Sequence, residues 1–366
     1  MKKKIVKKFK RLCAVTLTAS MIATGLTACG KKSVKNDKLT IVATIFPEYD
    51  WVMNILGDKA KDADVTLLLD NGVDLHSYSP SADDILKIKS ADVFIYVGGE
   101  SDEWVDDVLK DKLNKDMKVI NLVEALGESA KEEEIVEGMQ GEDEHDHDHG
   151  DADDHEDADE HDHEDADEHD HEDADHHDHD EDEEEVEYDE HTWLSTKNAI
   201  MYCEKIEEAI ASADSANKDA YKKNLDAYKA DLEKIYNEYE PKIKSANTNT
   251  IVCADRFPFR YLVDEFDLEY YAAFVGCSAE SEASFETVDF LSKKIDELNL
   301  KSVFVIENSD EKIAKTVIDN TKNKDAEILV LDSMQSVTKK DIENGKSYKG
   351  IMEENYKVLE KALNNK

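Results

Sequence analysis

Residues 217–240 read NKDAYKKNLDAYKADLEKIYNEYE and carry one apolar stripe. Its members recur at steps of three and four residues, at Tyr221, Leu225, Tyr228, Leu232, Ile235 and Tyr239. From residue 197 to 244 there is no glycine and one proline, Pro241. This spacing predicts a long helix, which at about 1.5 Å per residue would span on the order of 35 Å. Such a helix could join two lobes stiffly or pack on one of them, and the two interpretations are compatible.

Strand-like runs alternate with helix-period segments on both sides of this helix. The predicted strands cover residues 39–45, 64–69, 92–97 and 118–122 before it, and 250–254, 268–274, 302–306 and 327–331 after it. Continuous β-branched and aromatic runs separated by helices are typical of parallel sheets covered on both faces. The sequence therefore predicts an α/β protein of two doubly wound four-stranded lobes joined by a long rigid helix. A ligand is expected in the cleft, at the carboxyl ends of the strands.

The predicted organisation has five parts. Residues 1–28 form a signal peptide, 29–38 a tether, 39–215 an N-terminal lobe with an insertion at 141–190, 216–246 the linking helix and 247–366 a C-terminal lobe. The first part has a basic start, an apolar stretch at 12–26 and the run Leu26-Thr27-Ala28-Cys29-Gly30, which resembles a bacterial lipobox. That resemblance implies acylation of Cys29. An uncleaved anchor helix is the alternative, and in either case the folded part is held outside a membrane by its N-terminus.

The insertion is an acidic, histidine-rich tract. Residues 142–190 contain 31 Asp or Glu and 11 His but no Lys or Arg, and the sequence HEDADEHD repeats from His155 and His163. Such a tract cannot form a packed core. Because solvation needs no histidine, metal capture is favoured over an acidic solubilising loop. The histidines are His145, His147, His149, His155, His161, His163, His169, His171, His176, His177 and His179.

Charge and cysteine content narrow the remaining possibilities. Net charge is −43, of which 31 negative charges lie in the tract, so the rest is an ordinary acidic protein and nucleic acid is not an expected partner. Beyond Cys13 and Cys29, three cysteines remain: Cys203, Cys253 and Cys277. This odd number permits at most one disulfide. A bridge between Cys253 and Cys277, a buried thiol pair and a soft metal ligand all stay open.

Only two histidines lie outside the tract, His76 and His191. His76 follows a predicted strand, in a loop before a helix that begins near Ser79-Pro80 or Ser81. His191 directly follows the tract, where Trp193 and Leu194 indicate that the chain re-enters a core. Taken singly, each is more often a structural histidine than a ligand.

The surroundings of both histidines resemble a known family. Residues 72–80, GVDLHSYSP, are similar to the GxDPHxYxPxP segment of the zinc and manganese solute-binding lipoproteins of bacterial ABC importers. Residues 189–195, DEHTWLS, resemble the DPHxWLDP segment of that family, with Glu190 in place of Pro. Weaker similarity at 98–104, 303–307 and 329–332 extends the resemblance over residues 39–360. It implies two lobes around one metal in the cleft, with His76 and His191 as ligands from the first lobe.

The second-lobe ligands are less clear from the resemblance. Many family members have a third histidine where this chain has Arg256, which cannot bind a cation. Asp255 is the tentative replacement, although pairing with Arg256 or capping a helix explains it equally well. Asp332 matches the family's acid at the end of a late strand. Cys277 and Glu280 are reserve candidates, whereas Glu307 is interpreted as a cap. Two histidines with carboxylates or a thiolate suit Zn²⁺, and a more oxygen-rich shell would tolerate Mn²⁺.

The predicted function is capture of Zn²⁺ and its delivery to the permease and ATPase of an ABC importer. We expect a monomeric, extracytoplasmic protein, lipid-anchored to a bacterial cell membrane, that is not an enzyme, because HExxH pairs, nucleophile elbows and phosphate-binding glycine loops are missing from the sequence. The alternatives are a manganese or iron carrier of the same family, and a surface metal buffer or adhesin that acts through its tract.

Overall fold

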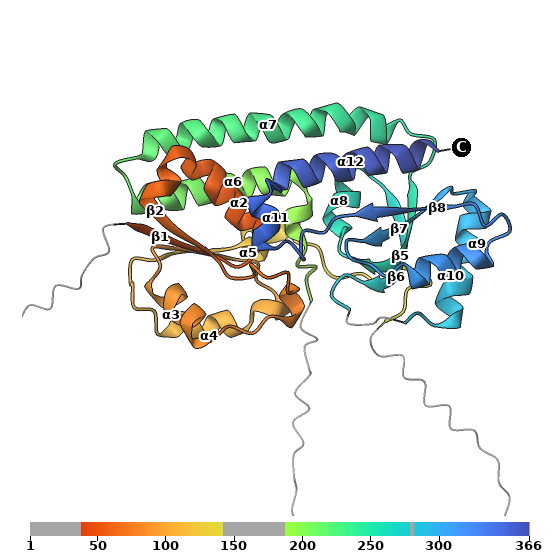
Figure 1. The fold of residues 1–366 in the computed structure, drawn as a ribbon, viewed down its shortest axis with the longest axis horizontal. Helices are drawn as coiled ribbons and strands as arrows, with labels where there is room; N and C mark the ends of the chain where they lie inside the picture. Colours follow the sequence, from red (N-terminus) through yellow and green to blue (C-terminus); the bar gives the residue numbers. More distant parts are fainter. Residues whose placement is uncertain (1–37, 142–186, 279–281, 366) are drawn as a thin grey trace, which may run out of the picture. The chain divides into compact units, whose positions relative to one another are not determined.

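The structure is a computed structural model that describes residues 38–141, 187–278 and 282–365. Several predicted features lie outside the described residues. They are the signal peptide, the tether with its Cys29 (only Lys38 of the tether is described), the eleven tract histidines and Glu280. The described residues from Thr40 onward belong to one compact unit. Its described part contains two four-stranded sheets with strand orders β2-β1-β3-β4 and β6-β5-β7-β8 (Figure 1). The prediction of an α/β fold with two four-stranded lobes is confirmed.

Each predicted strand is present, with ends that shift by a few residues. The strands are β1 Leu39–Ala43, β2 Ala63–Leu67, β3 Val93–Tyr96, β4 Lys118–Asn121, β5 Thr250–Phe257, β6 Glu269–Val275, β7 Ser302–Ile306 and β8 Glu327–Leu331. The pairs β1/β3, β3/β4, β5/β6, β5/β7 and β7/β8 are parallel. Strand β5 continues three residues beyond the prediction, because the register shifts between Cys253 and Arg256 and pairing then resumes. Asp255, which was expected directly at the end of this strand, and Arg256 therefore both lie within it.

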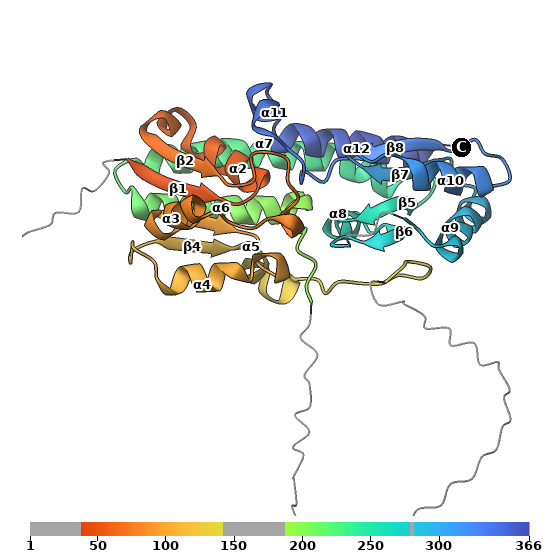
Figure 2. The same ribbon diagram turned by 60° about the horizontal axis from the view of Figure 1, so that its bottom comes forward.

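Helices cover both faces of each sheet (Figure 1, Figure 2). In the first lobe α2 and α6 contact one face, whereas α3 and α4 pack on the other around Phe94. In the second lobe α9 and α10 form a core with β5 to β7, and α12 contacts β5 and β8. The helices are α2 Phe46–Leu56, α3 Ala82–Ser90, α4 Trp104–Lys110, α5 Leu122–Leu126, α6 Thr196–Ala213, α7 Lys218–Lys244, α8 Arg260–Glu265, α9 Phe285–Leu298, α10 Lys312–Asn320, α11 Lys339–Glu343 and α12 Tyr348–Asn364.

Helix α7 is the predicted long helix. All six residues of its apolar stripe are buried, and they pack against α2 and α6 of the first lobe and against α12. The helix thus both connects the lobes and buries its stripe on them. Pro241 lies in its last turns. Among the described residues, none of the helices has the length and apolar character needed to cross a bilayer.

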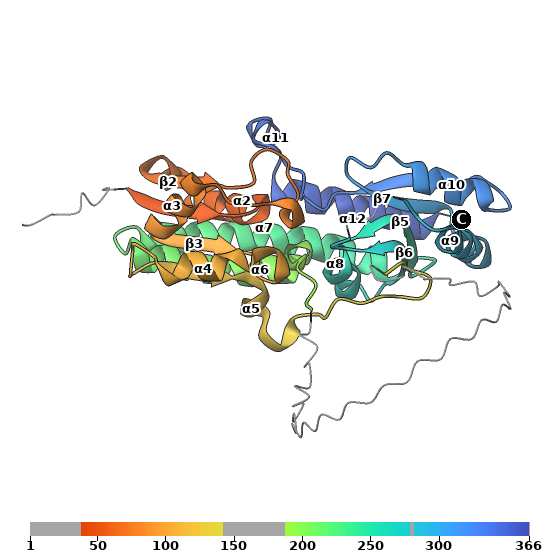
Figure 3. The same cartoon turned by 90° about the horizontal axis from the view of Figure 1, so that it is seen from below.

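Residues 130–141, here named the crossing segment, leave the first lobe after α5 and reach the second sheet (Figure 3). The Gln140 N–H donates to the carbonyl of Ala273 in β6 at 3.0 Å. Where the chain is described again, the Asp189 N–H donates to the Lys131 carbonyl at 2.8 Å. The predicted N-terminal lobe therefore includes a segment that pairs with the second sheet, and both described flanks of the tract are held by backbone hydrogen bonds.

Candidate metal centre

The two isolated histidines meet at the carboxyl ends of the strands. His76 lies in the 3-10 turn Leu75–Ser77 after β2. Asp74 caps this turn, since its Oδ1 accepts the His76 N–H at 3.1 Å. His191 directly precedes a second 3-10 turn, Thr192–Leu194, and is fully buried. The family resemblance expected both side chains to share one site, and the structure brings them together.

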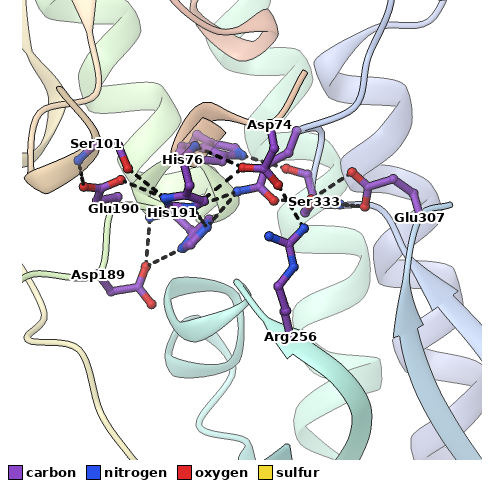
Figure 4. A network of polar contacts seen from close by, with 11 residues as sticks. Asp74, His76, Ser101, Asp189, Glu190, His191, Arg256, Glu307 and Ser333 are labelled. Carbon is purple, nitrogen blue, oxygen red and sulfur yellow. Dashed lines mark hydrogen bonds and ion pairs between the residues drawn. The ribbon is translucent and has the colours of Figure 1, made fainter. Parts of the chain in front are cut away.

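Their rings face each other through Nε2 (Figure 4). The two Nε2 atoms are 3.3 Å apart. Two nitrogen ligands on one tetrahedral zinc, each about 2.0–2.1 Å from the ion, would be separated by about 3.3 Å. The Nδ1 atoms point outward, that of His76 to Ser101 Oγ at 2.7 Å and that of His191 to Asp189 Oδ1 at 3.1 Å. Such outer partners fix the orientation of metal-binding imidazoles.

Buried acids lie beside and behind the histidine pair: Asp189 and Glu190 are next to the rings, Asp102 interacts with Glu190, and Glu48 interacts with Asp102. Asp189, Glu190, Asp102 and Glu48 are each at most 5% exposed. Burial raises the pKa of Asp102 to about 7, and the charge of the neighbouring Glu190 acts in the same direction. Burial and the charge of Asp102 raise the pKa of Glu48 to about 8. A cation bound at the histidines would favour the ionised forms of these acids and lower their pKa values.

Glu190 occupies the position where the family usually has Pro, and its environment explains the change. Its Oε1 accepts the Ser101 N–H at 2.8 Å, and its Oε2 lies 3.6 Å from His76 Nδ1. This approach depends on Gly99 (φ +81°), because a Cβ there would lie 2.5 Å from Glu190 Oε1. Asp189 and Glu190 were not predicted as part of the site. The only sequence signal was their position beside His191.

His76 is held in the form of imidazole that binds metal ions. Burial, and then the nearby His191, lower the pKa of His76 to about 3. The neutral imidazole is the form that binds metal ions. His76 therefore needs no deprotonation step near neutral pH.

From the second lobe, Cys277 reaches the same point. The ligand atoms of His76, His191 and Cys277 all lie within 4.8 Å of one another. The approach requires Gly276, because a Cβ at that position would lie 2.8 Å from His191 Cε1. Cys203, Cys253 and Cys277 are all free thiols, so the bridge between Cys253 and Cys277 that the sequence left open is not formed.

The two acids predicted from the second lobe have other partners. Asp255 accepts the Ser309 hydroxyl at 2.6 Å and the Arg256 N–H at 2.9 Å. Asp332 accepts the Met334 N–H at 2.8 Å and pairs with Lys346 at 2.9 Å. Within the described ranges, neither acid joins the group of mutually close ligand atoms. The structure therefore does not bring them to the histidines, and their role as ligands stays a prediction.

Arg256 forms an ion pair between the lobes. Its Nη2 donates to Asp74 Oδ2 at 2.9 Å (Figure 4). The guanidinium thus binds the residue that caps the His76 turn. A cavity of ≈ 390 Å³ adjoins this pair and is lined in part by Glu307 and Gln335. Glu307 accepts hydrogen bonds from Ser333 N and Oγ at 2.7 and 2.8 Å.

Gln335, from the loop after β8, also reaches the histidines. Its amide Nε2 lies 2.9 Å from His191 Nε2 and 3.4 Å from His76 Nε2. The two ends of an amide have the same shape, so a half-turn would direct the oxygen to this point instead. Sequence reasoning missed Gln335, because an uncharged amide is not a preferred zinc ligand and its loop carries no motif.

The sequence of the chain is similar to a known family and to two named proteins, one zinc-binding and one from a zinc uptake system. Residues 41–362 match the model of a family described as "Zinc-uptake complex component A periplasmic". The chain is 28% identical over 346 residues to the zinc-binding lipoprotein AdcA of Streptococcus pneumoniae, covering 94% of this chain and 60% of AdcA. It is 27% identical over 342 residues to the high-affinity zinc uptake system protein ZnuA of Bacillus subtilis, covering 92% and 93% of the two chains. The chain thus spans about three fifths of the length of AdcA.

Solved structures show the same fold. The Zn(II)-bound ZnuA-like domain of Streptococcus pneumoniae AdcA aligns with a TM-score of 0.63 at 23% identity, over 90% of this chain and all of that one. The metal-dependent lipoprotein YcdH of Bacillus subtilis aligns with a TM-score of 0.64 at 23% identity and the same coverage.

Proposed function

Because this chain belongs to the zinc-uptake complex component A family, we propose that it is a solute-binding protein whose cargo is Zn²⁺. One observation carries the proposal: the paired Nε2 atoms of His76 and His191, 3.3 Å apart, have the spacing of two ligands on one tetrahedral zinc. The family consists of transport components, and the proposed role is binding and release, not catalysis.

The geometry supports a carrier that binds and releases in separate movements. The first lobe supplies both imidazoles, fixed from behind by Ser101 and Asp189. The second lobe covers the site with the loops after β6 and β8. A shift of the second lobe would remove its contribution and leave a weaker two-histidine site. Contact with a permease could impose that shift.

We further propose an extracytoplasmic, monomeric lipoprotein that delivers Zn²⁺ to an ABC importer permease and its ATPase. A lipid on Cys29 would be the anchor. The tract histidines would capture zinc when it is scarce and raise its local concentration near the cleft. Names of relatives such as zinc-binding lipoprotein AdcA support the anchored location.

Calorimetry tests the proposal. A metal-stripped protein without residues 142–186 retains Glu187, whose carbonyl accepts the Glu133 N–H, and is titrated with zinc and with manganese. We expect one tight zinc per chain, lost in both His76→Ala and His191→Ala. Tighter binding of manganese than of zinc would identify Mn²⁺, and not Zn²⁺, as the cargo. If no tight site remains, the carrier role is wrong and the tract becomes the functional part.

A further inference from the structure

We infer that Cys277 supplies a thiolate ligand to the metal held by His76 and His191. The second lobe would then close on the ion through sulfur. This inference rests on the proposed function and specifies the chemistry of its site. Binding is an exchange: the S–H bond of Cys277 breaks, a bond between Sγ and the metal forms, and the proton leaves to the buffer.

The position of Cys277 is the first argument. Its Sγ and one ring nitrogen from each histidine lie within 4.8 Å of one another, although the three residues come from separate segments of the chain. On a tetrahedral zinc, a sulfur at about 2.3 Å and a nitrogen at about 2.0–2.1 Å would be separated by about 3.5 Å. A movement on the order of 1 Å by the loop after β6 therefore completes the site.

The packing of that loop is the second argument. Gly276 lies directly on the His191 ring: an added Cβ would be 2.8 Å from Cε1 and 3.0 Å from Nδ1. The loop therefore approaches the imidazole as closely as a backbone without a side chain permits. This close packing places the next residue, Cys277, beside the histidine pair.

The third argument is the state of the other second-lobe groups. Asp255 is bonded to Ser309, and Asp332 is paired with Lys346. Arg256 cannot bind a cation and is engaged with Asp74. The other second-lobe thiol, Cys253, is fully buried in β5, and Cys203 is fully buried in α6 of the first lobe. Among the described residues, Cys277 is therefore the second-lobe acid or thiol that lies beside the histidines.

A thiolate ligand has a consequence for cargo choice. Soft sulfur ligands favour zinc over the harder manganese ion. With Cys277 as a ligand, the second lobe would discriminate against manganese, whereas a carboxylate in the same place would accept it more readily.

Cobalt(II) provides the test, because it occupies zinc sites and a bond to thiolate gives a near-ultraviolet charge-transfer band. Co²⁺ is titrated into the metal-stripped full chain. The tract contributes imidazole and carboxylate but no cysteine between 142 and 186, so cobalt bound there gives no such band. We expect the band in the natural protein and in Cys203→Ala, but not in Cys277→Ser. Circular dichroism confirms that each variant is folded.

Zinc competition against a chelator gives a second readout. Losing an outer-shell partner costs about 10–100-fold in affinity, so Cys277→Ser should weaken zinc by at least about 100-fold. Cys277→Asp should recover part of the affinity and lower the preference for zinc over manganese.

The outcomes separate the two proposals. A natural protein that binds one tight zinc without the sulfur band, or a Cys277→Ser variant that keeps the band, overturns the thiolate and leaves the carrier role intact. Absence of any tight site in the natural protein overturns both.

Discussion

The two lobes contribute to the candidate site in different ways. In the first lobe each imidazole has a hydrogen-bond partner behind it, and Glu190 links the two loops through Ser101. In the second lobe the nearby acids are bonded elsewhere, and the approach depends on a side-chain-free Gly276 beside Cys277. A preorganised half binds without rearrangement, whereas an adjustable half can withdraw. We therefore expect the first lobe to provide a preformed half of the site, and the second lobe to complete it and to control selectivity and release.

The largest expected effect comes from removing a proposed first-lobe ligand. His191→Ala should weaken zinc by more than about 100-fold, since losing even an outer-shell partner costs about 10–100-fold. Chelator competition measures the affinity in a protein without residues 142–186. Thermal unfolding of the metal-free variant checks that the fold survives. If His191→Ala kept tight zinc binding, the site would lie elsewhere and the proposed difference between the two lobes would be wrong.

The next effect concerns Asp189, which holds the His191 ring through its Nδ1 atom. Asp189→Asn keeps the shape of the side chain but removes the charge beside His191 Nδ1, and should cost about 10–100-fold in zinc affinity. Asp332→Asn is the matched second-lobe variant, and should change affinity less than about threefold because Asp332 is paired with Lys346. An equal loss in both variants would make Asp332 a ligand after all.

A third prediction uses the buried acids of the first lobe. The pKa of Glu48 rises from its ordinary 4.5 to about 8, because of burial and the charge of Asp102. The folded chain therefore keeps this proton longer than the unfolded chain does. Its stabilising contribution is complete below pH 4.5 and is lost as pH rises towards 8.

Glu48→Gln stays neutral and should be more stable than the natural protein at pH 9 by on the order of 1–2 kcal/mol, and similar at pH 4; one pKa unit corresponds to about 1.4 kcal/mol. The measurement is urea unfolding of the metal-free protein at both pH values. Glu128→Gln, at an exposed position, is the control. If the stability of all three proteins changed equally between the two pH values, the pKa of Glu48 would not be raised by folding.

The smallest expected effect concerns the ion pair between the lobes. Arg256→Gln removes the guanidinium from Asp74. Because both side chains are about one fifth exposed, the stability cost should not exceed about 1 kcal/mol. Removing a positive charge near the site should also tighten zinc binding slightly, more at low salt than at high salt. A loss of affinity above tenfold would show that the pair holds the second lobe in its binding position.

The sequence predicted both first-lobe histidines of the candidate site, but from the second lobe it offered Cys277 only as a reserve candidate. The pairing of His76 with His191 was expected because both lie in short motifs that resemble those of one family, the first after a predicted strand and the second directly after the acidic tract. Asp255 was expected at a strand end, but the register shift in β5 keeps it within the strand. Gln335 and Glu190 act through contacts made only when distant loops meet. Local patterns therefore located the lobes and the histidines, while tertiary packing determines what completes the site.

The glycine at position 276 also has a consequence for how this protein can vary. Every substitution there adds a Cβ that meets the His191 ring at 2.8 Å and the Phe257 carbonyl oxygen at 3.1 Å. In a saturation mutational scan selected for growth under zinc limitation, position 276 should tolerate no replacement, although glycine offers the metal no side chain. Mutations that separate the loop from the ring would be lost from such a population as readily as mutations of a ligand.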